Sequence, residues 1–171
     1  MKIGVLGTGM VGSALAGGLA ALGHEVKMGA RESGNAKAKA WASGAGKGAS
    51  SGDFAEAAAF GEIVFSCTLG EQIQEAFPDA RVVKALNTVN AAVMVDPQRV
   101  GGESDLFVCG NDADAKARVT ALLKELGWTR VHDLGPIVAA RGTEAYLLLW
   151  LTLMGALKTA DFNVRIVRRS D

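Results

Sequence analysis

Three glycines near the start of the chain have the spacing of a turn that binds phosphate. Gly7, Gly9 and Gly12 stand directly behind a short apolar run and directly ahead of a helical pattern. In such a Gly-x-Gly-x-x-Gly turn the first glycine allows a tight bend, the second lets the backbone approach a pyrophosphate, and the third lets the helix pack closely on the strand. The motif predicts a dinucleotide-binding turn. The alternative is a glycine-rich turn in another kind of α/β protein.

The residues that follow the next apolar run indicate which dinucleotide binds. NAD enzymes place a carboxylate about 20 residues beyond the glycines, where it binds the ribose 2′-hydroxyl. This chain has Ala30 and Arg31 there, and a planar guanidinium suits a 2′-phosphate. With Lys37 as a second cation, the sequence favours NADP over NAD. Glu32 could form an ion pair with Arg31 or could itself face the ribose. Alternatively, Arg31 and Lys37 are solvated surface charges with no role in binding.

Strand-like and helix-like patterns alternate along the chain, as in a parallel sheet covered on both faces. We predict a single domain over residues 1–171, an α/β Rossmann-like fold with a doubly wound, mainly parallel sheet in three α/β/α layers. The predicted strands are residues 2–6, 25–28, 62–67, 81–86, 106–109 and 129–133. The clearest later helix spans residues 112–126, with Asn111 as its cap and Gly127 at its end. Residues 43–52 are predicted to be a flexible connection.

The composition, with 49% hydrophobic and 21% charged residues and a formal net charge of zero, is typical of a soluble enzyme domain. Because basic side chains do not cluster outside a short tail, we expect no nucleic-acid partner. Cys67 and Cys109 lack a Cys-x-x-Cys spacing, and His24 and His132 are equally scattered, so we expect no metal site. The two dispersed cysteines are typical of a reducing compartment, and the chain starts with a predicted core strand. We therefore expect a cytoplasmic protein.

The most apolar run covers residues 147–157 and reads LLLWLTLMGAL, from Leu147 to Leu157. It has about half of the roughly 20 residues that a membrane-spanning helix needs, so we expect no membrane anchor. A helix with so little polar surface must be covered on most sides. We favour a homodimer interface, and a core helix within one chain is the alternative.

Several stretches, spread over most of the chain, carry motifs of one family in the family's order. They read KIGVLGTGMVGSALA, GAR, FAEAAAFGEIVFSCT, VVKALNTVNA, LFVCGNDADAK and ARGTEAYLLLWLTLMGAL. They resemble the NADP-dependent coenzyme F420 (8-hydroxy-5-deazaflavin) oxidoreductases and the related reductase domain of the STEAP metalloreductases. The family's phosphate loop then consists of Gly7, Thr8, Gly9, Met10, Val11 and Gly12.

The resemblance also implies the remaining contacts with the cofactor NADP. The 2′-phosphate site falls on Ala30 and Arg31, with Lys37, and Ala30 stands where the family often has a hydroxyl that binds the phosphate. The residues that resemble the segment beside the ribose are Cys67 and Thr68. The residues that resemble the stretch near the nicotinamide are Asn87 and Thr88, for which an ordinary strand-to-loop turn is the alternative. Leu86 replaces the family's Phe there.

The activity implied by the resemblance is hydride transfer between the nicotinamide and a stacked deazaflavin, which needs no catalytic side chain. The chain departs from the family after Thr68, where about one α/β unit that helps to wall the deazaflavin site is missing, and residues 69–78 look like the helix that follows it. The gap has three possible origins: a natural deletion, an engineered shortening or a segment omitted from the sequence.

Two functions remain open. The chain is either an NADP-dependent oxidoreductase with a deazaflavin or flavin acceptor, or a dinucleotide-binding module with little turnover.

Overall fold

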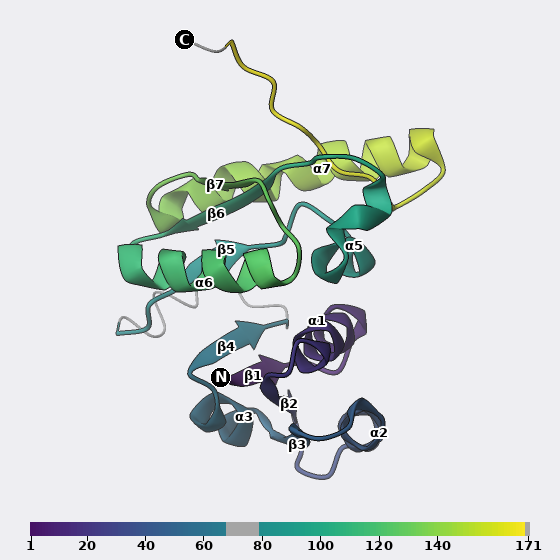
Figure 1. Ribbon diagram of the computed structural model, residues 1–171, viewed down its shortest axis with the longest axis vertical. Helices are drawn as coiled ribbons and strands as arrows, with labels where there is room; N and C mark the ends of the chain where they lie inside the picture. The colour runs from purple at the N-terminus through teal and green to yellow at the C-terminus, as the bar shows by residue number, and fades with distance from the viewer. Residues whose placement is uncertain (68–78, 170–171) are drawn as a thin grey trace. The chain divides into compact units, whose positions relative to one another are not determined.

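The structure is a computed structural model that describes residues 1–67 and 79–169. The chain divides into two compact units, Met1–Glu71 and Gln72–Asp171, each with its own sheet (Figure 1). Thr68 and residues 69–78, where a family helix is expected, lie outside the described residues. The prediction of a single domain over the whole chain stays a prediction.

The first unit contains a parallel sheet with the strand order β3-β2-β1-β4. Its elements are β1 (Lys2–Leu6), α1 (Met10–Ala21), β2 (Glu25–Ala30), α2 (Ala36–Ala45), β3 (Ala49–Asp53), α3 (Phe54–Phe60) and β4 (Ile63–Ser66). Helices α1 and α2 lie on one face of the sheet and α3 lies on the other (Figure 1). Because Leu6 is in register with both Gly29 and Ser66, the carboxyl ends of three strands meet at one edge. The predicted Rossmann-like α/β fold is confirmed.

Strand β3 corrects the prediction for residues 43–52, which we expected to be a flexible connection. Helix α2 continues to Ala45, and β3 then pairs in parallel with β2, where Ala49 is opposite Val26. The β3 sequence, ASSGD, contains small residues with low strand propensity and no apolar alternation. Its position as a strand therefore depends on main-chain pairing with β2, which a local pattern does not reveal.

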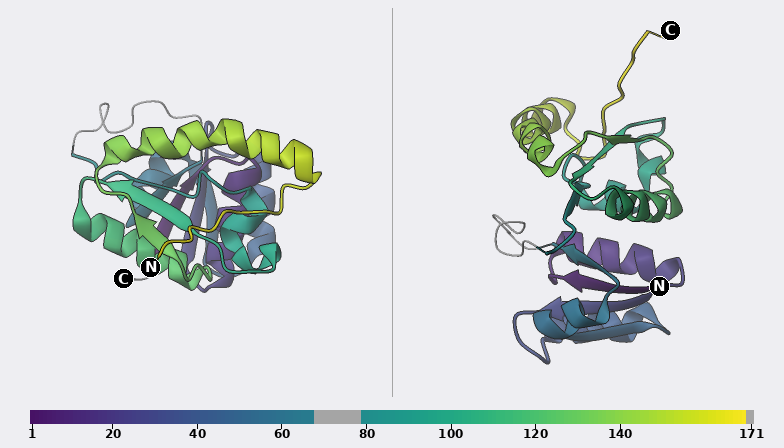
Figure 2. Two further views of the ribbon diagram at one scale, coloured as in Figure 1. Left: turned by 90° about the horizontal axis from the view of Figure 1, so that it is seen from above. Right: turned by 90° about the vertical axis from the view of Figure 1, so that its left-hand side faces the viewer.

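The second unit contains a smaller sheet with the strand order β5-β6-β7. Its elements are β5 (Val83–Ala85), α5 (Ala91–Val95), the 3-10 turn η1 (Pro97–Val100), β6 (Leu106–Gly110), α6 (Ala113–Glu125), β7 (Val131–Asp133), the 3-10 turn η2 (Ile137–Ala139) and α7 (Ala140–Leu157). The sheet lies between α6 and α7 (Figure 2). Strands β6 and β7 are parallel, but β5 is antiparallel to β6. A connection with only a five-residue helix and a 3-10 turn replaces the long crossover helix that parallel neighbours need.

The cap of α6 differs by one residue from the prediction. Asp112, not Asn111, caps the helix, because its carboxylate accepts a hydrogen bond from Ala115 N at 2.7 Å. The amide oxygen of Asn111 instead accepts a hydrogen bond from Ile137 N at 3.0 Å. Both residue types are good caps, so only the tertiary contact with η2 separates them. Gly127 ends the helix with a φ of +98°, as expected.

A buried carboxylate holds the second unit together. Asp105, which is 0% exposed, accepts hydrogen bonds from Arg130 Nε at 2.6 Å, from His132 Nε2 at 2.8 Å and from Ile166 N. Its own N–H donates to Val164 O at 2.9 Å. Burial alone would raise the pKa of Asp105, but these hydrogen bonds outweigh it and lower the pKa to about 2. The ionised carboxylate therefore fastens the C-terminal segment, residues 161–169, to the start of β6.

Helix α7 corrects the length argument against a membrane span. The apolar run from residue 147 is the second half of a longer helical segment, Ile137–Leu157, of 21 residues with a mean hydropathy of 1.3. In the described part of the chain this is the one helix whose length and composition would let it cross a membrane. It also carries the charged residues Arg141 and Glu144 in its first turns. Length therefore does not exclude a span, contrary to the expectation from the run alone.

Candidate dinucleotide site

The three glycines of the motif have distinct steric roles. Gly7 has a φ of +126°, and its N–H donates to Gly29 O at 3.0 Å, which ties the loop to the end of β2. A Cβ at Gly12 would lie 2.0 Å from Gly7 O, so α1 approaches the loop too closely for any side chain. A Cβ at Gly9 would meet no atom within 4 Å in the described part of the chain. The geometry fits the predicted loop, in which only Gly9 faces open space.

The N-terminus of α1 presents main-chain donors at this loop. The first N–H groups of a helix have no carbonyl partner within the helix. In the part of the chain that the structure describes, no side chain caps α1 at Gly9, and its first turn carries no acidic residue. Thr8 is half-buried and Met10 is 80% exposed at the start of this helix. The free donors and the positive end of the helix dipole are the features that a helix N-terminus uses to bind a phosphate group.

Cys67 directly follows β4 and lies against Gly7 of the phosphate loop. Its N–H donates to Leu6 O at 2.9 Å, and a Cβ at Gly7 would lie 3.1 Å from Cys67 O. Burial raises the pKa of the Cys67 thiol to about 11, so the thiol stays protonated at neutral pH and is a poor nucleophile. Thiolate chemistry at Cys67 is therefore not expected at neutral pH. Thr68, the next predicted residue, is outside the described residues.

Arg31 is the first residue after β2, beside the same sheet edge. Ala30 pairs with Asp53 of β3 and is 3% exposed, whereas Arg31 is exposed. Within residues 1–67 and 79–169, the structure shows no ion pair or side-chain hydrogen bond of Arg31. Glu32 therefore does not form the ion pair with Arg31 that the sequence left open. Among the described residues, the guanidinium therefore has no counter-charge.

Lys37 lies in the first turn of α2 and is exposed. The turn is capped by Asn35, whose side-chain oxygen accepts hydrogen bonds from Lys37 N at 3.1 Å and from Ala38 N at 3.2 Å. These bonds involve the main chain of Lys37, and its ammonium group has no ion pair within the part of the chain that the structure describes. The structure thus brings the phosphate loop, Ala30, Arg31 and Cys67 to one sheet edge, with Lys37 on the helix that follows.

Asn87 and Thr88 belong to the second unit and follow β5. The Asn87 amide donates to Thr143 O at 3.0 Å, and the Thr88 hydroxyl is buried with no hydrogen-bond partner among the described residues. Leu86, just before them, has a φ of +65°, a left-handed conformation that costs a non-glycine residue about 1 to 2 kcal/mol. Backbone strain of this kind collects at functional positions. No local sequence signal at Leu86 indicates it.

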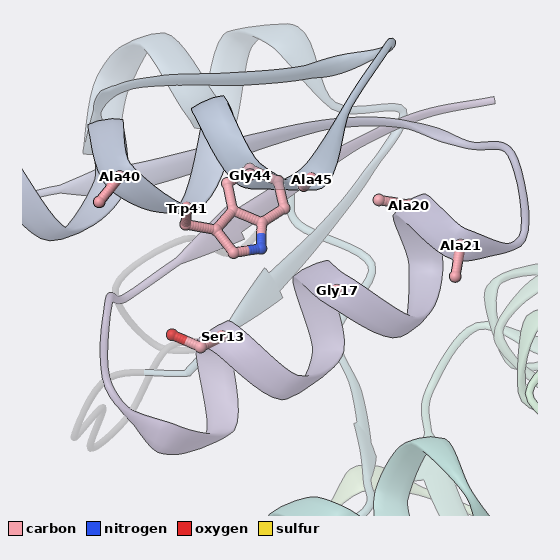
Figure 3. A pocket seen from close by; sticks show the side chains of 8 residues that line it. All are labelled: Ser13, Gly17, Ala20, Ala21, Ala40, Trp41, Gly44 and Ala45. Atoms are coloured by element: carbon pink, nitrogen blue, oxygen red, sulfur yellow. The ribbon is translucent and has the colours of Figure 1, made fainter.

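A separate groove of about 410 Å³ runs between α1 and α2. Figure 3 shows the Trp41 indole of α2 on the side that faces α1, where Ser13, Ala20 and Ala21 lie. Its lining residues are Ser13, Gly17, Ala20, Ala21, Ala40, Trp41, Gly44 and Ala45. None of the predicted site residues lines it, so it is distinct from the phosphate loop.

Comparison with known sequences identifies relatives of this chain. Residues 2–94 match the family described as NADP oxidoreductase, coenzyme F420-dependent. The F420-dependent NADP reductase of Methanocaldococcus jannaschii is 30% identical over 99 residues, which are 58% of this chain and 44% of that protein. Rat metalloreductase STEAP3 is 33% identical over 76 residues, 44% of this chain and 15% of that protein. The matches thus span less than half the length of either relative.

Solved structures agree with these sequence matches. A candidate F420-dependent NADP reductase from Arthrobacter sp. FB24 is 40% identical with a TM-score of 0.90, covering 98% of this chain and 100% of that one. An imine reductase from Myxococcus stipitatus, solved with NAD+, shares the fold at 19% identity with a TM-score of 0.66, over 92% of this chain and 63% of that one. Since the family match at residues 2–94 covers more than half of the sequence, the chain belongs to the family of coenzyme F420-dependent NADP oxidoreductases.

Proposed function

We propose that this protein transfers a hydride between NADPH and a deazaflavin of the coenzyme F420 type, or a related flavin. The family match over residues 2–94, which contain the phosphate loop and Arg31, carries this proposal. When bound, NADPH and the acceptor supply the redox chemistry, and the hydride leaves one ring with both electrons and adds to the other. The protein has to bind the two rings, orient them face to face and exclude water.

The residues of the first unit suit the NADP part of this task. Main-chain N–H groups at the start of α1 would bind the pyrophosphate, and Arg31 would bind the 2′-phosphate. Ala30 offers only a methyl group, so one hydrogen bond to the phosphate is missing compared with a Ser or Thr. Cys67 and Thr68 would line the ribose. The family resemblance also assigns Asn87 and Thr88, which belong to the second unit, to the stretch near the nicotinamide.

Replacing Arg31 with alanine tests the cofactor site. We expect NADPH affinity to fall about 10- to 100-fold, because a hydrogen-bonded contact with a charged group contributes about 1.5 to 3 kcal/mol. NADH has no 2′-phosphate, so its affinity should change less than twofold. Calorimetric titration of both nucleotides measures this, with Lys47→Ala as an exposed, charge-matched control on the same unit. An unchanged preference in Arg31→Ala would contradict the role of Arg31.

A second function is favoured by the family segment that is missing after Thr68, since that segment helps to wall the deazaflavin site in the family. A chain without it could bind NADP and turn over slowly or not at all. The Arthrobacter protein aligns over its whole length with 98% of this chain, so the short spacing is not peculiar to this sequence. Steady NADPH oxidation with a deazaflavin, a flavin or ferric iron would rule out the binding module. Tight binding without turnover would rule out the oxidoreductase.

We further infer that the second unit pairs with a second copy through α7. Leu147, Leu148 and Leu151 are 52%, 76% and 47% exposed, an apolar surface that a folded protein normally covers. Light scattering after size-exclusion chromatography should give a dimer, and Leu148→Glu should give a monomer because it buries a charge in the interface. Val167→Glu, at an 86% exposed site outside the helix, is the control. A monomeric wild-type protein would contradict the inference.

A further inference from the structure

The loop between β2 and α2 has a fixed shape. Gly34 adopts a φ of +86°, which turns the chain, and Asn35 closes the loop by capping α2 through its side-chain oxygen. Arg31 stands at the other end of this five-residue loop, directly after β2. Gly34 is three residues from Arg31, the residue for which we propose a 2′-phosphate contact.

Lys39 folds its side chain back onto this loop. The Lys39 Nζ atom lies 3.3 Å, and its Cε atom 3.7 Å, from the position that a Cβ on Gly34 would occupy. This direction is the usual one, since side chains in a helix point back toward its N-terminus. Gly34 makes room for the ammonium group, because any side chain there would crowd it.

Lys37 cannot take the same position. Successive residues in an α-helix are about 100° apart around the axis, so Lys37 and Lys39 leave α2 about 200° apart, on nearly opposite sides. Among the described residues that do not adjoin Gly34, only atoms of Lys39 lie within 4 Å of the Cβ position at Gly34, and Lys37 leaves the helix on the other side. The family resemblance favours Lys37 as the second cation, but the conformation of the loop favours Lys39.

Both cations at the loop lack a counter-charge. In the described residues neither Arg31 nor Lys39 has an ion pair, and Glu32, the one carboxylate in the loop, pairs with neither. An ammonium group that forms no ion pair can bind an anion without first breaking one. A phosphate monoester, with a charge near −2, matches two cations better than the neutral hydroxyl of NAD does.

We propose that Lys39, and not Lys37, is the second residue that selects NADP over NAD, by binding the 2′-phosphate together with Arg31. This inference rests on the proposed function, because it assigns a further residue to the same dinucleotide site.

The test compares Lys39→Ala with Lys37→Ala, two variants that remove the same charge from exposed positions of the same helix. Calorimetry would measure the affinity of each variant and of the wild type for NADPH, NADH and adenosine 2′-monophosphate. We expect Lys39→Ala to weaken the binding of NADPH and of adenosine 2′-monophosphate by about 10-fold, the lower end of the loss for one hydrogen-bonded charged contact. NADH binding should change less than twofold, and Lys37→Ala should match the wild type for all three ligands.

The outcomes separate the two proposals. If the wild type prefers NADPH and Lys39→Ala keeps that preference, or if Lys37→Ala weakens NADPH equally, the assignment of Lys39 is wrong and the proposed function stands. If the wild type binds neither NADPH nor adenosine 2′-monophosphate, both fail. Equal melting temperatures of the two variants would show that both are folded, as expected for exposed substitutions.

Discussion

Replacing Asp105 with alanine should lower the free energy of unfolding by about 3 kcal/mol at pH 7. Removing one partner of a buried ion pair costs about 3 to 5 kcal/mol. We expect a loss at the lower end of this range, because the side chains of Arg130 and His132 are 31% and 38% exposed and water can solvate them once the carboxylate is gone. The loss also leaves Ile166 N without its acceptor, so the C-terminal segment should detach from β6. Urea denaturation followed by circular dichroism measures the change in stability.

The control for this variant is Glu103→Ala. Glu103 forms an ion pair with Arg165 of the same C-terminal segment at 3.2 Å, but both side chains are more than half exposed. Exposed pairs of this kind contribute about 0 to 1 kcal/mol. A loss in Asp105→Ala no larger than that in Glu103→Ala would show that the buried carboxylate does not hold the segment.

The pH dependence gives the same experiment a second readout. The folded-state pKa of Asp105 is about 2, below the ordinary value of 3.8, so its contribution to stability is present above pH 4 and is lost as pH falls toward 2. The shift corresponds to about 2 kcal/mol. The stability gap between the wild type and Asp105→Ala should therefore narrow by this amount between pH 4 and pH 2.

The second large effect is expected for Gly12→Ala, which should reduce NADPH affinity about 100-fold or more. The new Cβ would lie 2.0 Å from Gly7 O, so the loop and the start of α1 must separate. At least two N–H contacts with a charged phosphate would then be lost, each contributing about 1.5 to 3 kcal/mol. Calorimetric titration with NADPH measures the affinity.

Gly17→Ala is the matched control in the same helix. A Cβ at Gly17 meets no atom within 4 Å among the described residues, and Gly→Ala in a helix interior stabilises by about 0.5 to 1 kcal/mol. This variant should bind NADPH like the wild type and melt at a slightly higher temperature. If Gly12→Ala also binds NADPH within twofold of the wild type, the close approach at Gly12 is not needed for binding.

Elements with a strong local pattern were predictable. Strand β1 has the predicted bounds, because an apolar run followed by glycines leaves the backbone few alternatives. Strand β3 was missed, because Ala, Ser and Gly acquire strand structure there only by pairing with β2. The helical run at residues 147–157 was recognised, but the full length of α7 was not, since its first half carries Arg141 and Glu144 among small residues.

The candidate site divides in the same way. Gly7, Gly9 and Gly12 were predictable, since each role follows from the absence of a Cβ within a few residues of chain. The approach of Lys39 to the Gly34 loop was not predictable, because helix phase alone does not reveal which cation folds back onto that loop. The sequence contained only a weak signal that Asp105 binds two basic side chains. Arg130 and His132 are two residues apart in the predicted strand 129–133, so they share one face of it.

The sequence by itself determined the family, the phosphate loop and the alternation of strands and helices, because these depend on short-range sterics and on motifs contiguous in the chain. The tertiary structure alone decided the antiparallel pairing of β5, the burial of Asp105 beside Arg130 and His132, and the approach of Lys39 to Gly34. Each of these depends on how separate elements pack, which sets the distances and the exposure of their side chains.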